Sequence, residues 1–259
     1  MSGFGANWDL LRLLVVREVR VRYARAALGM AWAVFLPVVM LLIFSSLPLK
    51  QLFGDDSPYN DVPYPVFAFT GLIFWMNFQQ SILSGTSSLA VAHDILHKSR
   101  FPAELIPLSR ILAWLLDLVI GFVLLLVLML WTGADWHATA LLVPVVFLVQ
   151  SAFTVGLALL TSSVNLFFRD VHYMLQALMP LLMLASNVAW PLDSVTGTKG
   201  DILRLNPIVS FLEAYRSLLL LGKLPSLESA LPGLVGAVVA GGVGWVYFRR
   251  VRHRFAEEV

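Results

Sequence analysis

Cysteine is absent from the 259-residue chain, and charged residues are scarce. Without cysteine the chain can form no disulfide, has no thiol nucleophile and offers no thiolate ligand to a metal. Charged side chains make up 13% of the residues, about half the share of an ordinary soluble domain. This composition excludes a disordered chain and an extended nucleic-acid binder, and no nucleic-acid partner is expected.

Several catalytic signatures are missing as well. The sequence contains neither the G-x-x-x-x-G-K-[ST] of a phosphate-binding loop nor the G-x-S-x-G of a serine hydrolase. The trio His93, Asp94 and His97 lacks the H-E-x-x-H order, so no metal site is expected. Arginines interrupt the first 25 residues, which argues against a cleavable signal peptide. We therefore expect a chain that is not an enzyme and binds no cofactor of its own.

Apolar residues, in contrast, are abundant in the sequence. Hydrophobic residues make up 59% of the chain, and the mean hydropathy is +0.81. A soluble protein of this size has no interior large enough for so many apolar side chains. The apolar runs are continuous and roughly 20 residues long, which indicates membrane helices rather than the alternating strands of a barrel. We predict an all-α polytopic membrane protein, a single domain with six spans near residues 28–49, 64–88, 107–131, 138–163, 171–191 and 230–248.

The distribution of Lys and Arg predicts the orientation, because cytoplasmic loops are enriched in them. Most of the 18 basic residues fall on one side, within 12–25, 98–110, 169 and 249–254. The other side holds Lys50, Lys199, Arg204, Arg216 and Lys223. Both termini are therefore predicted to be cytoplasmic, in agreement with an even number of spans.

Two cytoplasmic segments do not span. Residues 8–25 repeat apolar side chains among arginines, which fits a helix lying in the membrane interface and equally fits an anchor that only sets orientation. The loop after the second span can form a short helix that ends before Phe101-Pro102. It presents apolar and charged groups that could dock on a cytoplasmic partner, although an ordinary basic loop fits too. The docking candidates are His93, Asp94, Ile95, Leu96, His97, Lys98 and Arg100.

A further short helix is predicted over residues 206–222, on the outer side. Asn206 is a good N-cap, Pro207 suits the first helical position, and Gly222 can end the helix. The stretch is too short to span the membrane and too apolar to lie in water without a partner. This predicts a re-entrant or surface-lying helix at the outer mouth of the helix bundle. Glu213 and Arg216 lie three residues apart and can pair on one face.

Polar residues recur every three or four positions along the second predicted span. They would be costly in lipid, so they should face either a watery path or another helix. The aromatic rings just before them could stack on the faces of a sugar. Asp117, well inside the third span, is either a buried, hydrogen-bonded packing residue or a polar wall of the path. The candidate path consists of Phe74, Trp75, Asn77, Phe78, Gln80, Ser81, Ser84, Ser88 and Asp117.

Four segments in series resemble the membrane subunit of ABC exporters for cell-surface polysaccharides, the group that exports O-antigen, capsule and teichoic acid. They are RYARAALGMAW at 22–32 with Pro37, HKSRFPAELIPL at 97–108, NLFFRDV at 165–171, and Asn206-Pro207 followed by Tyr215-Arg216. The matches lie in the family's order and cover nearly the whole chain. The chain departs from the family late in the fifth span, where a common Ser-Pro pair is replaced by Ser186-Asn187.

The resemblance implies a transport subunit that moves a lipid-linked, O-antigen-like polysaccharide across the bacterial inner membrane, from cytoplasm to periplasm. It implies two copies of the chain around a central path, in contact with membrane lipid. Two copies of a separate ATPase would bind ATP and Mg and would receive residues 93–100 as a coupling helix. The outer helix would be a gate, with Asn206, Pro207, Phe211, Glu213, Tyr215 and Arg216 as its candidate residues.

Other functions are compatible with the sequence. The exported polymer could be teichoic acid or capsule. An ion-coupled secondary transporter could use Asp117, and an inverted internal repeat would favour it, but none is visible. A membrane enzyme or scaffold is the third alternative.

Overall fold

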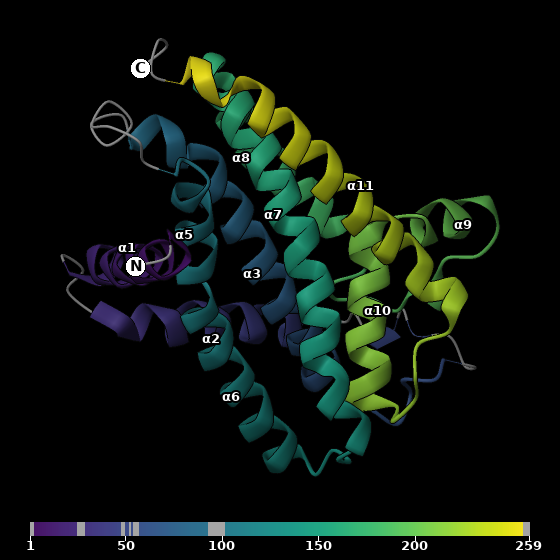
Figure 1. Cartoon of the computed structure of the whole chain (residues 1–259). Helices are drawn as coiled ribbons and strands as arrows, with labels where there is room; N and C mark the ends of the chain where they lie inside the picture. The colour runs from purple at the N-terminus through teal and green to yellow at the C-terminus, as the bar shows by residue number, and fades with distance from the viewer. Residues whose placement is uncertain are drawn as a thin grey trace.

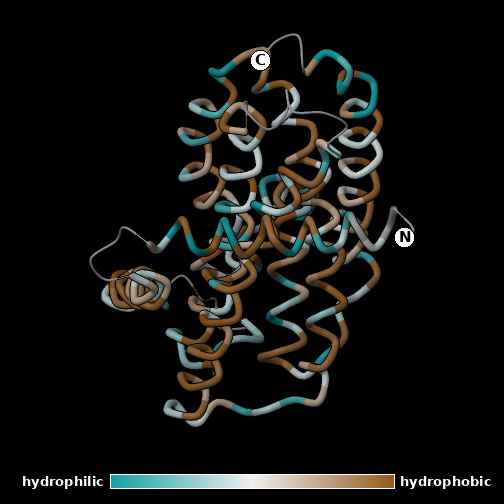
Figure 2. Tube along the Cα trace, turned by 60° about the vertical axis from the view of Figure 1, so that its left-hand side comes forward, coloured by the Kyte–Doolittle hydropathy of each residue, from teal (hydrophilic) through white to brown (hydrophobic). Residues whose placement is uncertain are grey.

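The computed structural model describes residues 3–24, 29–47, 50–51, 53, 57–92 and 102–255, and all regular structure within them is helical, as predicted. The longer helices are α1 (Gly3–Tyr23), α2 (Trp32–Ser46), α3 (Tyr64–Val91), α5 (Leu105–Ala113), α6 (Leu115–Thr132), α7 (Val143–Phe167), α8 (Asp170–Leu184), α9 (Thr198–Arg204), α10 (Pro207–Leu220) and α11 (Leu227–Val251) (Figure 1). Short 3₁₀ turns precede α2 and α7 and follow α11. Most of the long helices are apolar along their length (Figure 2).

Among the described residues, five stretches are long and apolar enough to cross a membrane. They are Gly29–Ser46, Tyr64–Val91, Leu105–Thr132, Ala138–Phe167 and Leu227–Arg254. Each overlaps a predicted span, although the third is divided at Trp114 into α5 and α6. The fifth predicted span, 171–191, corresponds to α8, which has 15 residues and ends at Leu184. Because a crossing helix needs roughly 20 apolar residues, a sixth crossing stays a prediction.

Helix α2 takes a different course from the long helices. In Figure 1 it lies across α3 and α6, which it contacts, rather than along them. Ala33 and Pro37 are its buried residues, whereas Phe35 and Leu42 are exposed. The predicted first span therefore forms an apolar helix, but contacts within one chain bury little of it. Its passage through the membrane stays a prediction.

The charge pattern assigns the connecting segments to two sides of the membrane. Segments assigned to the same side meet at the same end of the helix bundle. At one end an apolar cluster joins the ends of α3 and α11 to α5 and α7; its buried members are Leu89, Ile106, Leu159, Phe248 and Phe255. At the other end, Asp61, Gly133 and Lys223 line one cavity, so the segments before α3, between α6 and α7, and after α10 meet. Gly133 ends α6 with a φ of 69°, a left-handed conformation that glycine adopts without strain.

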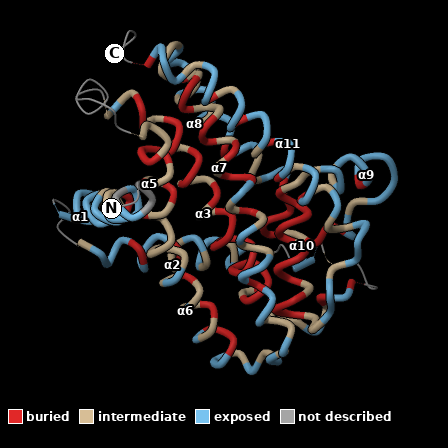
Figure 3. Tube along the Cα trace, in the orientation of Figure 1, coloured by how far each residue is buried: buried red, intermediate tan, exposed pale blue. Residues whose placement is uncertain are grey.

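Helix α10 is buried within the bundle. It packs against α3, α7 and α11, and most of its residues are shielded (Figure 3). The surface-lying alternative for residues 206–222 is therefore wrong, because the apolar side chains of this helix find neighbours on three sides. That the helix re-enters the membrane from outside stays a prediction.

Helices α7 and α11 approach closely through small residues (Figure 1). A Cβ atom on Gly244 would overlap the carbonyl oxygen of Gly156, and one on Gly156 would overlap the backbone at Ala240. Ala240 and Gly244 are four residues apart, so they share one face of α11. Small residues at this spacing let membrane helices pack backbone against backbone.

We expect Gly244→Ala to destabilise the protein by about 2 kcal/mol, because the methyl group forces the two backbones apart. Gly242→Ala is the matched control on the same helix, since a Cβ atom there meets nothing within 4 Å. Thermal unfolding in detergent should show a lower midpoint for the first variant alone. Equal midpoints for both variants would contradict the close approach.

Candidate functional site

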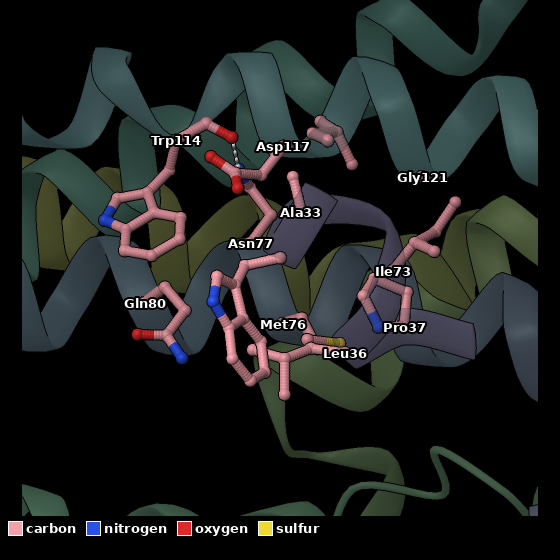
Figure 4. A pocket seen from close by; sticks show the side chains of 12 residues that line it. Ala33, Leu36, Pro37, Ile73, Met76, Asn77, Gln80, Trp114, Asp117 and Gly121 are labelled. Atoms are coloured by element: carbon pink, nitrogen blue, oxygen red, sulfur yellow. Dashed lines mark hydrogen bonds between the residues drawn. The ribbon is translucent and has the colours of Figure 1, made fainter. Parts of the chain in front are cut away.

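A small cavity of about 70 Å³ lies between α2, α3 and the junction of α5 with α6 (Figure 4). Helix α3 contributes Asn77 and Gln80 to its wall, and the junction contributes Trp114 and Asp117. Trp32 lines it from α2. The structure thus brings three residues of the predicted path to one cavity, on helices that are separate in the sequence.

The three aromatic residues of the predicted path are packed inside the chain. Phe74, Trp75 and Phe78 are each at most 3% exposed. The ring of Phe74 stacks on Tyr215 with centroids 3.5 Å apart, and Phe78 stacks on Phe153 at 5.9 Å. All three are buried among other side chains, so a contact with a sugar stays a prediction that this burial disfavours.

The serines among the polar residues of α3 lie in contacts between helices. The Trp114 indole donates a hydrogen bond to the Ser84 hydroxyl at 2.9 Å, and Ser84 donates to the Gln80 carbonyl at 2.7 Å. Ser81 and Ser88 are buried, and their hydroxyls have no hydrogen-bond partner among the described residues. The polar residues of α3 therefore divide into two groups. Asn77 and Gln80 line the cavity, whereas Ser81 and Ser88 are buried between helices.

Asp117 has partners that the sequence did not reveal. The Arg22 guanidinium lies 2.6 Å from its carboxylate, and the Tyr23 hydroxyl donates to its other oxygen. Burial, together with the Asp117 carboxylate, raises the pKa of Tyr23 to about 12, so the phenol stays protonated at neutral pH and can donate. Asp117 is thus hydrogen-bonded and also lines the cavity, so the two roles predicted for it as alternatives are compatible.

A second polar cluster surrounds Arg216, whose side chain is fully buried. The predicted pair with Glu213 is present, with a distance of 3.4 Å between the charged groups. The guanidinium also donates to the carbonyl oxygens of Asn187, at 2.9 Å, and Val188, at 2.6 Å. It lies over the Phe67 ring, 3.8 Å from its centroid, which adds a cation–π contact.

Glu213 connects α10 to the segment before α3 and to the segment after α8. Its carboxylate accepts hydrogen bonds from the Tyr59 hydroxyl at 2.9 Å and from the Asn187 amide at 2.6 Å. Burial and the Glu213 charge raise the pKa of Tyr59 far above its ordinary value, which keeps the donor protonated. Asn187 has a φ of 45°, which a proline ring cannot adopt. The replacement of the family's Ser-Pro by Ser186-Asn187 thus supplies both a turn and a donor.

The remaining predicted gate residues hold α10 in place. The Asn206 side chain accepts from the Ile208 amide at 3.0 Å, and Pro207 begins the helix, so the predicted cap is confirmed. The Tyr215 hydroxyl donates to Gln150 at 2.6 Å, and Phe211 is buried.

The predicted coupling residues lie outside the described residues: His93, Asp94, Ile95, Leu96, His97, Lys98 and Arg100. Within the described part of the chain, no three His, Asp or Glu side chains gather as a metal site would require. Sequence reasoning missed Arg22, Tyr23, Tyr59, Asn187 and Gln150 as partners. The unpaired appearance of Asp117 in an apolar span was the one available signal, because such a charge needs a partner.

We expect Arg216→Met to destabilise the protein by about 3 kcal/mol, because it leaves the partly buried Glu213 carboxylate without its cation. Arg204→Met removes a cation from an exposed position on the preceding helix and serves as the control. Thermal unfolding in detergent measures both. A midpoint for Arg216→Met equal to that of the control would show that the buried pair contributes nothing.

The sequence matches one protein family and several named proteins. The family model described as ABC-2 type transporter matches residues 9–220. The chain is 32% identical to an O-antigen export system permease protein RfbA of Myxococcus xanthus, over 96% of this chain and 95% of that protein. An RfbA of Klebsiella pneumoniae is 27% identical, over 98% and 96% of the two chains. The polysialic acid transport protein KpsM of Escherichia coli is 28% identical, over 92% and 88%. The chain therefore belongs to the ABC-2 type transporter membrane family.

Proposed function

We propose that this chain is the membrane-spanning subunit of an exporter that moves a lipid-linked, O-antigen-like polysaccharide from the cytoplasm to the periplasm. The observation that carries the proposal is the extent of the likeness, since relatives named O-antigen export permeases align with 96% and 98% of the chain. The likeness to a polysialic acid transport protein makes a capsular polymer the second candidate. Membership of the ABC-2 family and the Arg22–Asp117 pair together disfavour the ion-coupled carrier.

The energy for export would come from a separate ATPase that binds ATP and Mg. This chain has no phosphate-binding loop, so hydrolysis by that route requires a partner. We assign two copies of each subunit to the transporter and the contact with the ATPase to residues 93–100. The basic end of the bundle, which carries Arg169 and Arg249, would face the cytoplasm, since basic residues are retained on that side.

In this assembly the two polar clusters would have different tasks. The cavity at Asn77, Gln80 and Asp117 would form a polar section of the path, where hydroxyl-rich sugar rings could exchange hydrogen bonds with amides and a carboxylate. The cluster at Arg216 and Glu213 would hold the outer gate, because it ties α10 to two outer segments.

Inverted membrane vesicles offer the test of this function. We expect uptake of the lipid-linked polysaccharide to require ATP, this chain and its partner ATPase, and to survive an uncoupler that collapses the proton gradient. Vesicles with an ATPase that cannot hydrolyse nucleotide are the control. Uptake that stops with the uncoupler and continues without ATP would contradict the proposal and favour an ion-coupled carrier.

A further inference from the structure

The helix over Leu105–Thr132 is interrupted beside the cavity, and two other helices supply donors at the interruption. Helix α5 ends at Ala113 and α6 begins at Leu115, so Trp114 lies between them. The Ala113 carbonyl accepts a hydrogen bond from Arg22 at 3.3 Å, and the Trp114 carbonyl accepts one from Asn77 at 3.1 Å (Figure 4). Side chains from α1 and α3 therefore hold the backbone where the helix bends.

Arg22 contacts three different groups around the bend. Its guanidinium lies 2.6 Å from the Asp117 carboxylate and 3.5 Å from the centroid of the Trp114 ring system. The Arg22 and Asp117 side chains are 20% and 19% exposed, so water screens the pair only in part. One side chain thus contacts the last carbonyl of α5, the ring at the bend and the first turn of α6.

The same contacts attach α1 to the cavity wall. Along α1, Glu18 also pairs with Arg110 of α5 at 3.3 Å, one turn before the bend. The two ion pairs fix α1 on both sides of Trp114. A displacement of α1 must either break the Arg22–Asp117 pair or move the bend, and Trp114 and Asp117 both line the cavity.

We propose that Arg22 is a positioning residue that joins the N-terminal helix to the bend at Trp114, so that the position of α1 sets the shape of the cavity. In the intact pair the Trp114 ring lies against Ser84 and the cavity stays small. When the pair is released, the bend relaxes and the cavity opens toward α2. This inference concerns the internal mechanics of the chain and does not depend on which polymer is exported.

The absence of cysteine allows a direct test, because one introduced thiol is unique. Gln80→Cys places that thiol in the cavity wall, and its rate of reaction with N-ethylmaleimide in the purified protein reports cavity opening. We expect Arg22→Gln to raise this rate roughly tenfold, as the loss of a charge-assisted hydrogen bond predicts. Asp117→Asn should raise it equally, and the double variant should exceed neither single variant, because both remove one interaction.

Two controls separate this mechanism from general loosening. Arg20→Gln removes the same charge from an exposed position on α1 and should leave the rate unchanged. Val188→Cys reports from the buried outer cluster, and its rate should not change in Arg22→Gln. An unchanged rate at position 80 in Arg22→Gln, an equal rise at position 188, or single-variant effects that multiply would each overturn the proposal. These outcomes are independent of the vesicle assay, so the two proposals can fail separately.

Discussion

Lipid offers no hydrogen bonds, so each polar group inside a membrane-embedded chain must find its partner within the protein. The structure supplies such partners in three ways, although the buried hydroxyls of Ser81 and Ser88 have none among the described residues. Hydroxyls such as Thr70 and Thr154 bond to carbonyls one turn earlier in their own helix. Amides such as Asn77 and Gln150 reach the backbone of a neighbouring helix. The ion pairs at Asp117 and Glu213 lie in two clusters that hold separate segments of the chain together.

Helix α3 links these two clusters. Its N-terminal part supplies Phe67 beneath the Arg216 guanidinium, and Gly71 faces the same group, because a Cβ atom there would overlap it. Its middle supplies Asn77 and Gln80 to the cavity, and its C-terminal end joins the apolar cluster at Leu89. The cluster at Arg216, the cavity and the apolar cluster therefore share one mostly buried helix (Figure 3). Such a helix can transmit a displacement from one end to the other, because packed side chains move together.

The sequence predicts those helix caps and ion pairs whose two partners lie close together along the chain. The cap at Asn206 and the pair of Glu213 with Arg216 follow from residue type and spacing alone. The all-helical fold follows from continuous apolar runs.

Features that depend on distant parts of the chain were not readable in this way. Arg22 and Asp117 are 95 residues apart, and nothing in their local sequence joins them. The burial of α10 and the inward packing of Phe74 depend on which helices become neighbours, which periodicity does not specify. The short α8 reflects a turn at Asn187 whose donor acts on Glu213, again a tertiary contact.

In the function proposed above, this chain provides a path and a gate while another protein hydrolyses the nucleotide. Native mass spectrometry of the complex purified from its own bacterial membrane in mild detergent tests this most directly. We expect two copies of this chain with two copies of a protein that carries a phosphate-binding loop, and ATPase activity that disappears when that protein is removed. A purified chain that hydrolyses ATP alone, or that transports with no such partner, would contradict it.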